Sequence, residues 1–285
     1  MKKTLIALVL TATAVSGSAM AWTANGTGGS MEFGGTIAVT KVPQWLVQMG
    51  AGDSSFSSVD SDLTGENKEL TITSNKAIPF IQVKSKEAYS GLNYSLGTMP
   101  AFAISGGDDV TITRSWVNNK LSFSVPVYIN GGVDKAGAVT FEDVAVGGLM
   151  YGGKVNSSSD GIALVVSDNH RVPASLFAGA VGGSSEALDV TNTEGQFNQL
   201  GLGSLISEAK ALVGATYTTW TDQGWLQSIA TNTAVEKFNN ESMDKGAAIF
   251  SMGVQSGGAI KLAFTQAVKQ NTTWKAPIKI TVNYQ

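Results

Sequence analysis

Residues 274–285 read WKAPIKITVNYQ, and this stretch decides the fold class. Its apolar side chains alternate with polar ones, so that Ile278, Ile280, Val282 and Tyr284 share one face. Strict alternation of this kind predicts a β-strand that is buried on one side only. We therefore expect a strand here that borders a hydrophobic core.

Further alternating segments precede this strand and make the chain β-rich. The clearest is a hairpin, in which apolar residues alternate over 248–254 and 260–264 around the turn QSGG at 255–258. Pro126 is expected at an edge or a bulge, because proline cannot donate to a strand ladder. The other expected strands contain residues 70–72, 81–83, 121–129, 139–146 and 162–166.

Only the region of about 150–245 departs from this pattern. A helix capped by Ser204 is expected to stop at Gly214, and a shorter helix is expected from Asp222 to Ile229. The sequence therefore predicts an all-β sandwich with an inserted subdomain that contains short helices.

The N-terminus has the features of an exported protein. Two lysines, an apolar run over 5–15 and the small residues Ala19 and Ala21 predict a signal peptide over 1–21. The following stretch, 22–30, is rich in Gly, Asn and Thr and is expected to be flexible.

An alternating strand follows this flexible stretch. Its inward residues are Met31, Phe33, Gly35, Ile37 and Val39. One interpretation is an ordinary edge strand that closes its own sandwich. The interpretation we favour is a donor strand, in which an N-terminal extension over 22–39 adds to a neighbouring subunit and 40–285 forms the folded domain. The flexible stretch would then act as its tether.

Residues suited to catalysis or metal binding are scarce. The chain has no cysteine and one histidine, His170, which removes the usual zinc sites and cysteine nucleophiles. Residues 60–65 begin like a calcium loop, but Thr71 stands at the twelfth position where glutamate is required. The net charge of −3 argues against a nucleic-acid partner. We expect no catalytic residue, no metal and no cofactor.

Aromatic residues in the inserted region are the candidates for glycan binding, because aromatic rings stack on sugar faces. These candidates are Tyr217, Trp220, Trp225 and Phe238. The alternative is that Trp225 and Phe238 form the core of the inserted subdomain.

Several short segments carry a family resemblance. They are the leader MKKTLIAL at 1–8, the junction Ala21-Trp22, the glycines flanking the donor strand, Gly253, Ile260, FTQAV at 264–268, WKAP at 274–277 and Tyr284. On these segments the chain resembles the FaeG-type adhesive major subunits of chaperone–usher fimbriae of enterotoxigenic Escherichia coli. The resemblance is strongest at the two ends and fades across 90–245.

The resemblance implies an incomplete immunoglobulin-like sandwich, the pilin fold, whose missing strand a neighbour supplies. It implies that residues 278–284 border the open groove and pair with a periplasmic chaperone before assembly at an outer-membrane usher. It further implies a cell-surface fimbrium, related subunits as partners, and adhesion to host glycoconjugates through the inserted region. A minor subunit of the same fibre and a self-contained secreted carbohydrate-binding protein remain as alternatives.

Overall fold

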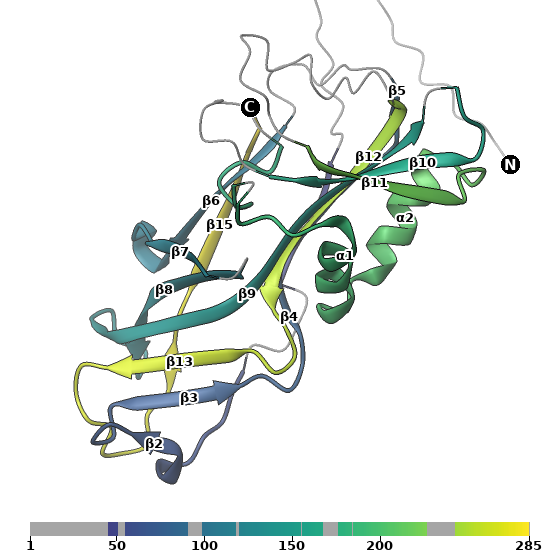
Figure 1. The fold of residues 1–285 in the computed structure, drawn as a ribbon. Helices are drawn as coiled ribbons and strands as arrows, with labels where there is room; N and C mark the ends of the chain where they lie inside the picture. The colour runs from purple at the N-terminus through teal and green to yellow at the C-terminus, as the bar shows by residue number, and fades with distance from the viewer. Residues whose placement is uncertain are drawn as a thin grey trace, which may run out of the picture. The chain divides into compact units, whose positions relative to one another are not determined.

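The computed structural model describes residues 45–50, 55–90, 99–117, 120–154, 156–167, 176–183, 185–226 and 243–284 (Figure 1). Its strands are β1 (Trp45–Met49), β2 (Leu63–Thr64), β3 (Glu69–Thr73), β4 (Ile78–Ser85), β5 (Tyr89–Ser90), β6 (Pro100–Gly106), β7 (Arg114–Val117), β8 (Lys120–Ile129), β9 (Lys135–Lys154), β10 (Asp160–Val166), β11 (Thr219–Leu226), β12 (Met243–Val254), β13 (Ala259–Phe264), β14 (Trp274–Lys275) and β15 (Ile278–Tyr284). The helices are α1 (Val190–Gln199) and α2 (Gly203–Val213), and short 3-10 turns are η1 (Asp60–Asp62) and η2 (Gly107–Asp109). Within these residues, no helix is long and apolar enough to span a membrane.

The long strand β9 belongs to two sheets. Its first half pairs with β8 and β13, and its second half pairs with β10 and β12. The register against β8 shifts between Leu121 and Phe123, and Asp143 on β9 has a positive φ of 56°. Such a β-bulge bends a strand, so β9 can pass from one sheet into the other.

The other strands extend the two sheets from β9. On one side the order runs β9, β12, β4, β1, and on the other side β10 and β11 follow β9. The second sheet adds β3 and β2 beyond β13, while β7 and β14 flank β8. A separate antiparallel pair, β6 and β15, covers part of the main core.

The main core lies between these layers. Phe102 of β6 stacks on Phe250 of β12 with 4.7 Å between ring centroids. Phe80 of β4 contacts Phe123 of β8 edge-on at 6.2 Å. Aromatic pairs of this geometry stabilise a core beyond the burial of their area. The fold is therefore the all-β sandwich that the sequence predicts.

A second core lies under α1 and α2, on the outer face of the sheet that contains β10, β12 and the second half of β9. In the second half of β9, Val146 and Met150 face the main core, whereas Leu149 and Tyr151 pack against the helices. The strand is buried on both faces for this reason. The helices thus form a third layer over part of the sandwich, as Figure 1 shows.

The strand predictions are largely confirmed. The hairpin of β12 and β13, the strands containing 70–72, 81–83 and 162–166, and the final strand β15 all occur. Pro126 lies opposite Ala138 of β9. On the edge of β8 away from β9, Pro126 lies between the residues that pair with β7 and those that pair with β14. Pro126 therefore lies at a locally open edge, as predicted.

The helix predictions are partly wrong. The helix ending at Gly214 is present as α2, but Leu202 is its N-cap and Ser204 lies inside the first turn. The expected helix from Asp222 to Ile229 is not formed over 222–226, which belong to β11 and pair in parallel with β10, and residues 227–229 lie outside the described part of the chain. Helix α1 was not predicted, although Asp189 caps it by accepting a hydrogen bond from the backbone of Asn192 at 2.7 Å.

Candidate functional site

Strand β15 has the alternation predicted for it. It pairs with β6 from Ile278, opposite Gly106, to Tyr284, opposite Pro100. Ile278, Ile280 and Val282 are partly buried against the main core. Among the described strands, only β6 pairs with β15, so the other edge of β15 has no strand beside it in this part of the chain.

Strand β1 also lies at an edge of the sandwich. Among the described strands, only β4 pairs with it, and Trp45 is buried with its ring 5.7 Å from that of Phe177. Val47 lies opposite Val83 and Met49 opposite Ile81, and both partners are buried in the main core. Val47 and Met49 therefore face the core side, because paired residues point to the same face of a sheet.

Apolar side chains on this core side are poorly covered. Val47 is 39% exposed, Met49 is 48% exposed, and Tyr284 at the end of β15 is 49% exposed. Trp45 and the inward residues of β15 belong to or pack against the same main core. We call β1, β15 and these three exposed side chains the open core edge. A strand added here would find backbone groups to pair with and apolar side chains to cover.

Other predicted site residues lie outside the described part of the chain. They are Met31, Phe33, Gly35, Ile37, Val39 and Phe238. Trp225 lies on β11, but its side chain is not described. Their proposed roles therefore stay predictions.

The aromatic candidates Tyr217 and Trp220 lie together beside the helical layer. Their ring centroids are 6.3 Å apart, and Trp220 meets the Tyr151 ring edge-on at 5.4 Å. Gly161 lies directly beneath Trp220, since a Cβ atom there would come within 2.5 Å of the indole. The ammonium of Lys210 lies 5.6 Å from the Trp220 ring. Trp220 is therefore held in place by its neighbours, and Tyr217, like Trp220, is partly buried against the second core.

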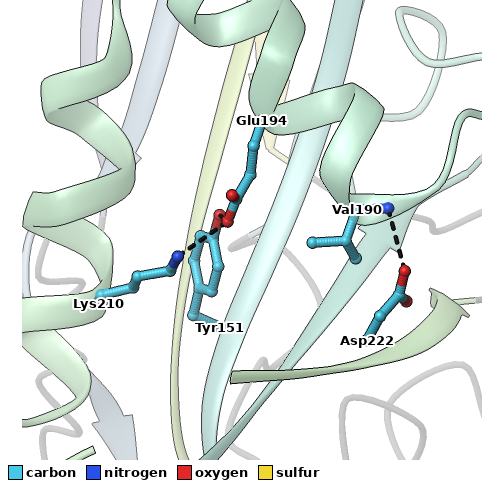
Figure 2. A network of polar contacts seen from close by, with 5 residues as sticks. All are labelled: Tyr151, Val190, Glu194, Lys210 and Asp222. Atoms are coloured by element: carbon cyan, nitrogen blue, oxygen red, sulfur yellow. Dashed lines mark hydrogen bonds and ion pairs between the residues drawn. The ribbon is translucent and has the colours of Figure 1, made fainter. Parts of the chain in front are cut away.

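A polar network holds Tyr151, which contacts Trp220, beside the two helices (Figure 2). The hydroxyl of the fully buried Tyr151 donates to Glu194 of α1 at 2.7 Å, and Lys210 of α2 donates to the same carboxylate oxygen at 2.9 Å. Burial raises the pKa of the Tyr151 hydroxyl well above its ordinary value, and the Glu194 carboxylate raises it further. The network joins both helices to β9.

Sequence reasoning did not find this network. Tyr151, Glu194 and Lys210 are far apart in the chain, and none stands in a recognisable motif. Asp222 likewise lies 3.4 Å from the backbone amide of Val190 at the start of α1, from which it accepts a hydrogen bond. The spacing of side chains along one strand or helix gives no signal for such long-range contacts.

The structure offers no sign of a metal centre in the part that it describes. No group of three potential ligands from His, Asp and Glu gathers there. The segment that begins like a calcium loop forms η1 and the short strand β2. Asp62 accepts a hydrogen bond from the Val59 backbone amide at 3.0 Å, so its carboxylate stabilises this turn.

In the part of the chain that the structure describes, the fold is a β-sandwich in which no further strand pairs with the outer edges of β1 and β15. The chain belongs to the family described as fimbrial, major and minor subunit, which matches residues 1–285. It is similar to K88 fimbrial protein AD of Escherichia coli, at 25% identity over 300 residues. It is also similar to K88 fimbrial protein AC, at 27% over 294 residues, and to the F41 fimbrial protein, at 26% over 296 residues, both from Escherichia coli. Each alignment covers 100% of both chains.

This membership confirms the FaeG-type resemblance and places the protein in an exported surface fimbria. Its partners therefore include other fimbrial subunits.

Proposed function

We propose that the chain is a major adhesive subunit that polymerises by donor-strand complementation. In this proposal, the extension 22–39 of one subunit lies between β1 and β15 of the next. The observation that carries it is the exposure of Val47, Met49 and Tyr284 on the core side of two strand edges. Apolar side chains in such positions favour a covering strand over solvent.

The energy of the joint is sufficient for a durable fibre. The donor strand offers four large apolar side chains, Met31, Phe33, Ile37 and Val39. Burying one such side chain fully contributes roughly 1.5–3 kcal/mol, and the backbone ladder adds to this. Gly35 would face the shallowest point, where a side chain would collide with the acceptor.

The proposal implies two assembly partners. Before polymerisation the same open core edge would need cover, and a periplasmic chaperone that lends a strand would supply it. An outer-membrane usher would then exchange the chaperone strand for that of the next subunit. The resemblance and the family membership favour this route.

The test uses two tryptophan substitutions on adjacent residues of the donor strand. Gly35→Trp places a ring toward the core side of the acceptor, whereas Thr36→Trp places it toward solvent, because successive strand residues face opposite sides. We expect Gly35→Trp to abolish the ladder of polymers on unboiled denaturing gels. Thr36→Trp should keep the ladder. Equal ladders from both variants would contradict the proposal and favour a strand that closes its own sandwich.

We also propose that the subunit itself binds host glycans through the aromatic residues beside the helices. Tyr217 is only partly buried, and the neighbouring Trp220 is held by Tyr151 and Lys210. A ring held in one orientation loses little conformational freedom when it stacks on a sugar.

Glycan-array binding by purified fibres tests this adhesive role. Tyr217→Ala should lower binding, while Tyr217→Phe should retain it, because the ring remains. Unchanged binding after Tyr217→Ala would remove this residue from the receptor site. Trp220→Ala is less informative, because it also removes contacts with Tyr151 and Lys210.

A further inference from the structure

The open core edge has two distinct ends. At one end, the ring of Trp45 contacts Phe177, and the backbone amide of Phe177 donates to the carbonyl of Pro100 at 2.8 Å. Pro100 lies opposite Tyr284, so β1 begins where β15 ends. Figure 1 shows the end of β15 near the top of the view and β2 at the bottom.

The turn before β2 lies at the opposite end. Phe56 stacks on Trp274 with 6.4 Å between centroids and 6° between ring planes. Trp274 precedes β15 by only a few residues, so the segment from Phe56 to η1 lies at the end where β15 begins. We call residues 55–62 the η1 segment.

The η1 segment holds an apolar side chain in water. Val59 is 61% exposed. Its backbone amide donates to the Asp62 carboxylate at 3.0 Å, and its carbonyl accepts from the Asp62 amide at 3.0 Å. The backbone that carries Val59 is therefore fixed before any partner arrives, which lowers the entropic cost of a contact.

Linear growth decides which end meets the next subunit, provided that the proposed donor-strand joint is correct. The extension of each subunit leaves its own body at the Trp45 end. If the body attached to an incoming donor strand also lay at the Trp45 end, two neighbouring bodies would occupy the same space. The incoming body must therefore lie at the other end, beside the η1 segment.

The connection between donor strand and body is short. Five residues, 40–44, separate Val39 from Trp45. The six Cα-to-Cα steps from Val39 to Trp45 therefore span at most about 22 Å when fully extended. The Trp45 end of the incoming subunit must then lie close to the η1 segment of its acceptor.

From these steps we infer that the η1 segment, with Val59 at its centre, is a body-to-body contact between consecutive copies of this chain. Its partner surface is the end of the next copy where β1 begins and β4 ends. Lys86 marks that surface, because it is exposed and follows Ser85, which lies opposite Trp45. Donor strand and body contact would together set how freely the fibre bends at each joint.

Cross-linking tests this contact directly, because the chain contains no cysteine. Fibres are prepared from full-length subunits that carry Val59→Cys and Lys86→Cys, and a short bismaleimide is added. The matched control carries Thr191→Cys with Lys86→Cys. Thr191 is exposed on α1, which packs on the sheet that contains β10 and β12 and not on the sheet of β2 and β3 next to the η1 segment. Boiling in detergent then dissociates every joint that is not covalent.

We expect the Val59→Cys pair to shift most subunits from monomer to covalent dimers and longer ladders after boiling, and the control pair to stay monomeric. Intact ladders before boiling without this shift would overturn the inference and leave the donor-strand joint standing. An equal shift in the control would also overturn it. Loss of ladders before boiling in the parent chain would instead refute the proposed joint, and with it the inference.

Discussion

Replacing Ile280 by alanine is expected to weaken the joint between subunits by about as much as it weakens the subunit itself. Ile280 is inward-facing and only partly buried in the isolated chain. The change removes about three carbon groups, each worth about 0.8 kcal/mol when buried. If about half of this burial comes from the donor strand, each joint loses about 1 kcal/mol. A loss of this size speeds dissociation about fivefold.

The assay follows the unboiled polymer ladder as a function of temperature and time. Lys279→Ala is the matched control, because Lys279 lies on the same strand but faces solvent, where its side chain is 57% exposed and pairs with Asp109. An exposed ion pair contributes about 0–1 kcal/mol to the subunit and nothing to an added strand. Identical ladder stability in the two variants would refute the assignment of β15 as a joint-forming strand.

Three further predictions concern the stability of the folded domain. Glu194→Ala should lower the free energy of unfolding in urea by about 1–3 kcal/mol, since the buried Tyr151 hydroxyl loses its acceptor; an unchanged midpoint would contradict this. Stability should also fall as pH rises above about 10, because the unfolded chain then releases the Tyr151 proton that the folded chain retains; Tyr151→Phe should flatten that slope in alkaline melts. Gly253→Ala should cost about 1–3 kcal/mol, since the new Cβ would lie 2.5 Å from the Ile78 carbonyl oxygen. Its control, Gly195→Ala on α1, meets nothing within 4 Å and should stabilise by up to about 1 kcal/mol.

Much of the strand content could be predicted from the sequence because its signal is local. In β13 and β15, each inward residue is apolar and the outward residues are polar or alanine, and the turn QSGG supplies the glycine with φ of 84° at Gly257. The exposure of one face to solvent is what makes this alternation visible. The C-terminal part of the family resemblance depended on the same strands.

Elements decided by distant contacts could not be predicted. Helix α1 reads VTNTEGQFNQ and has few apolar residues, so its stability depends on its cap and on packing against β9. The segment after Asp222 has the apolar spacing of a short helix, but pairing with β10 makes it a strand. Tertiary contacts override weak local preferences in such segments.

The most direct test of donor-strand assembly removes the donor and returns it as a peptide. A subunit that lacks residues 22–39 should stay monomeric, and a peptide of residues 31–39 should bind it and raise its melting temperature. The same peptide carrying Gly35→Trp should neither bind the truncated subunit nor raise its melting temperature. A truncated subunit that still polymerises, or that ignores the unmodified peptide, would contradict the account.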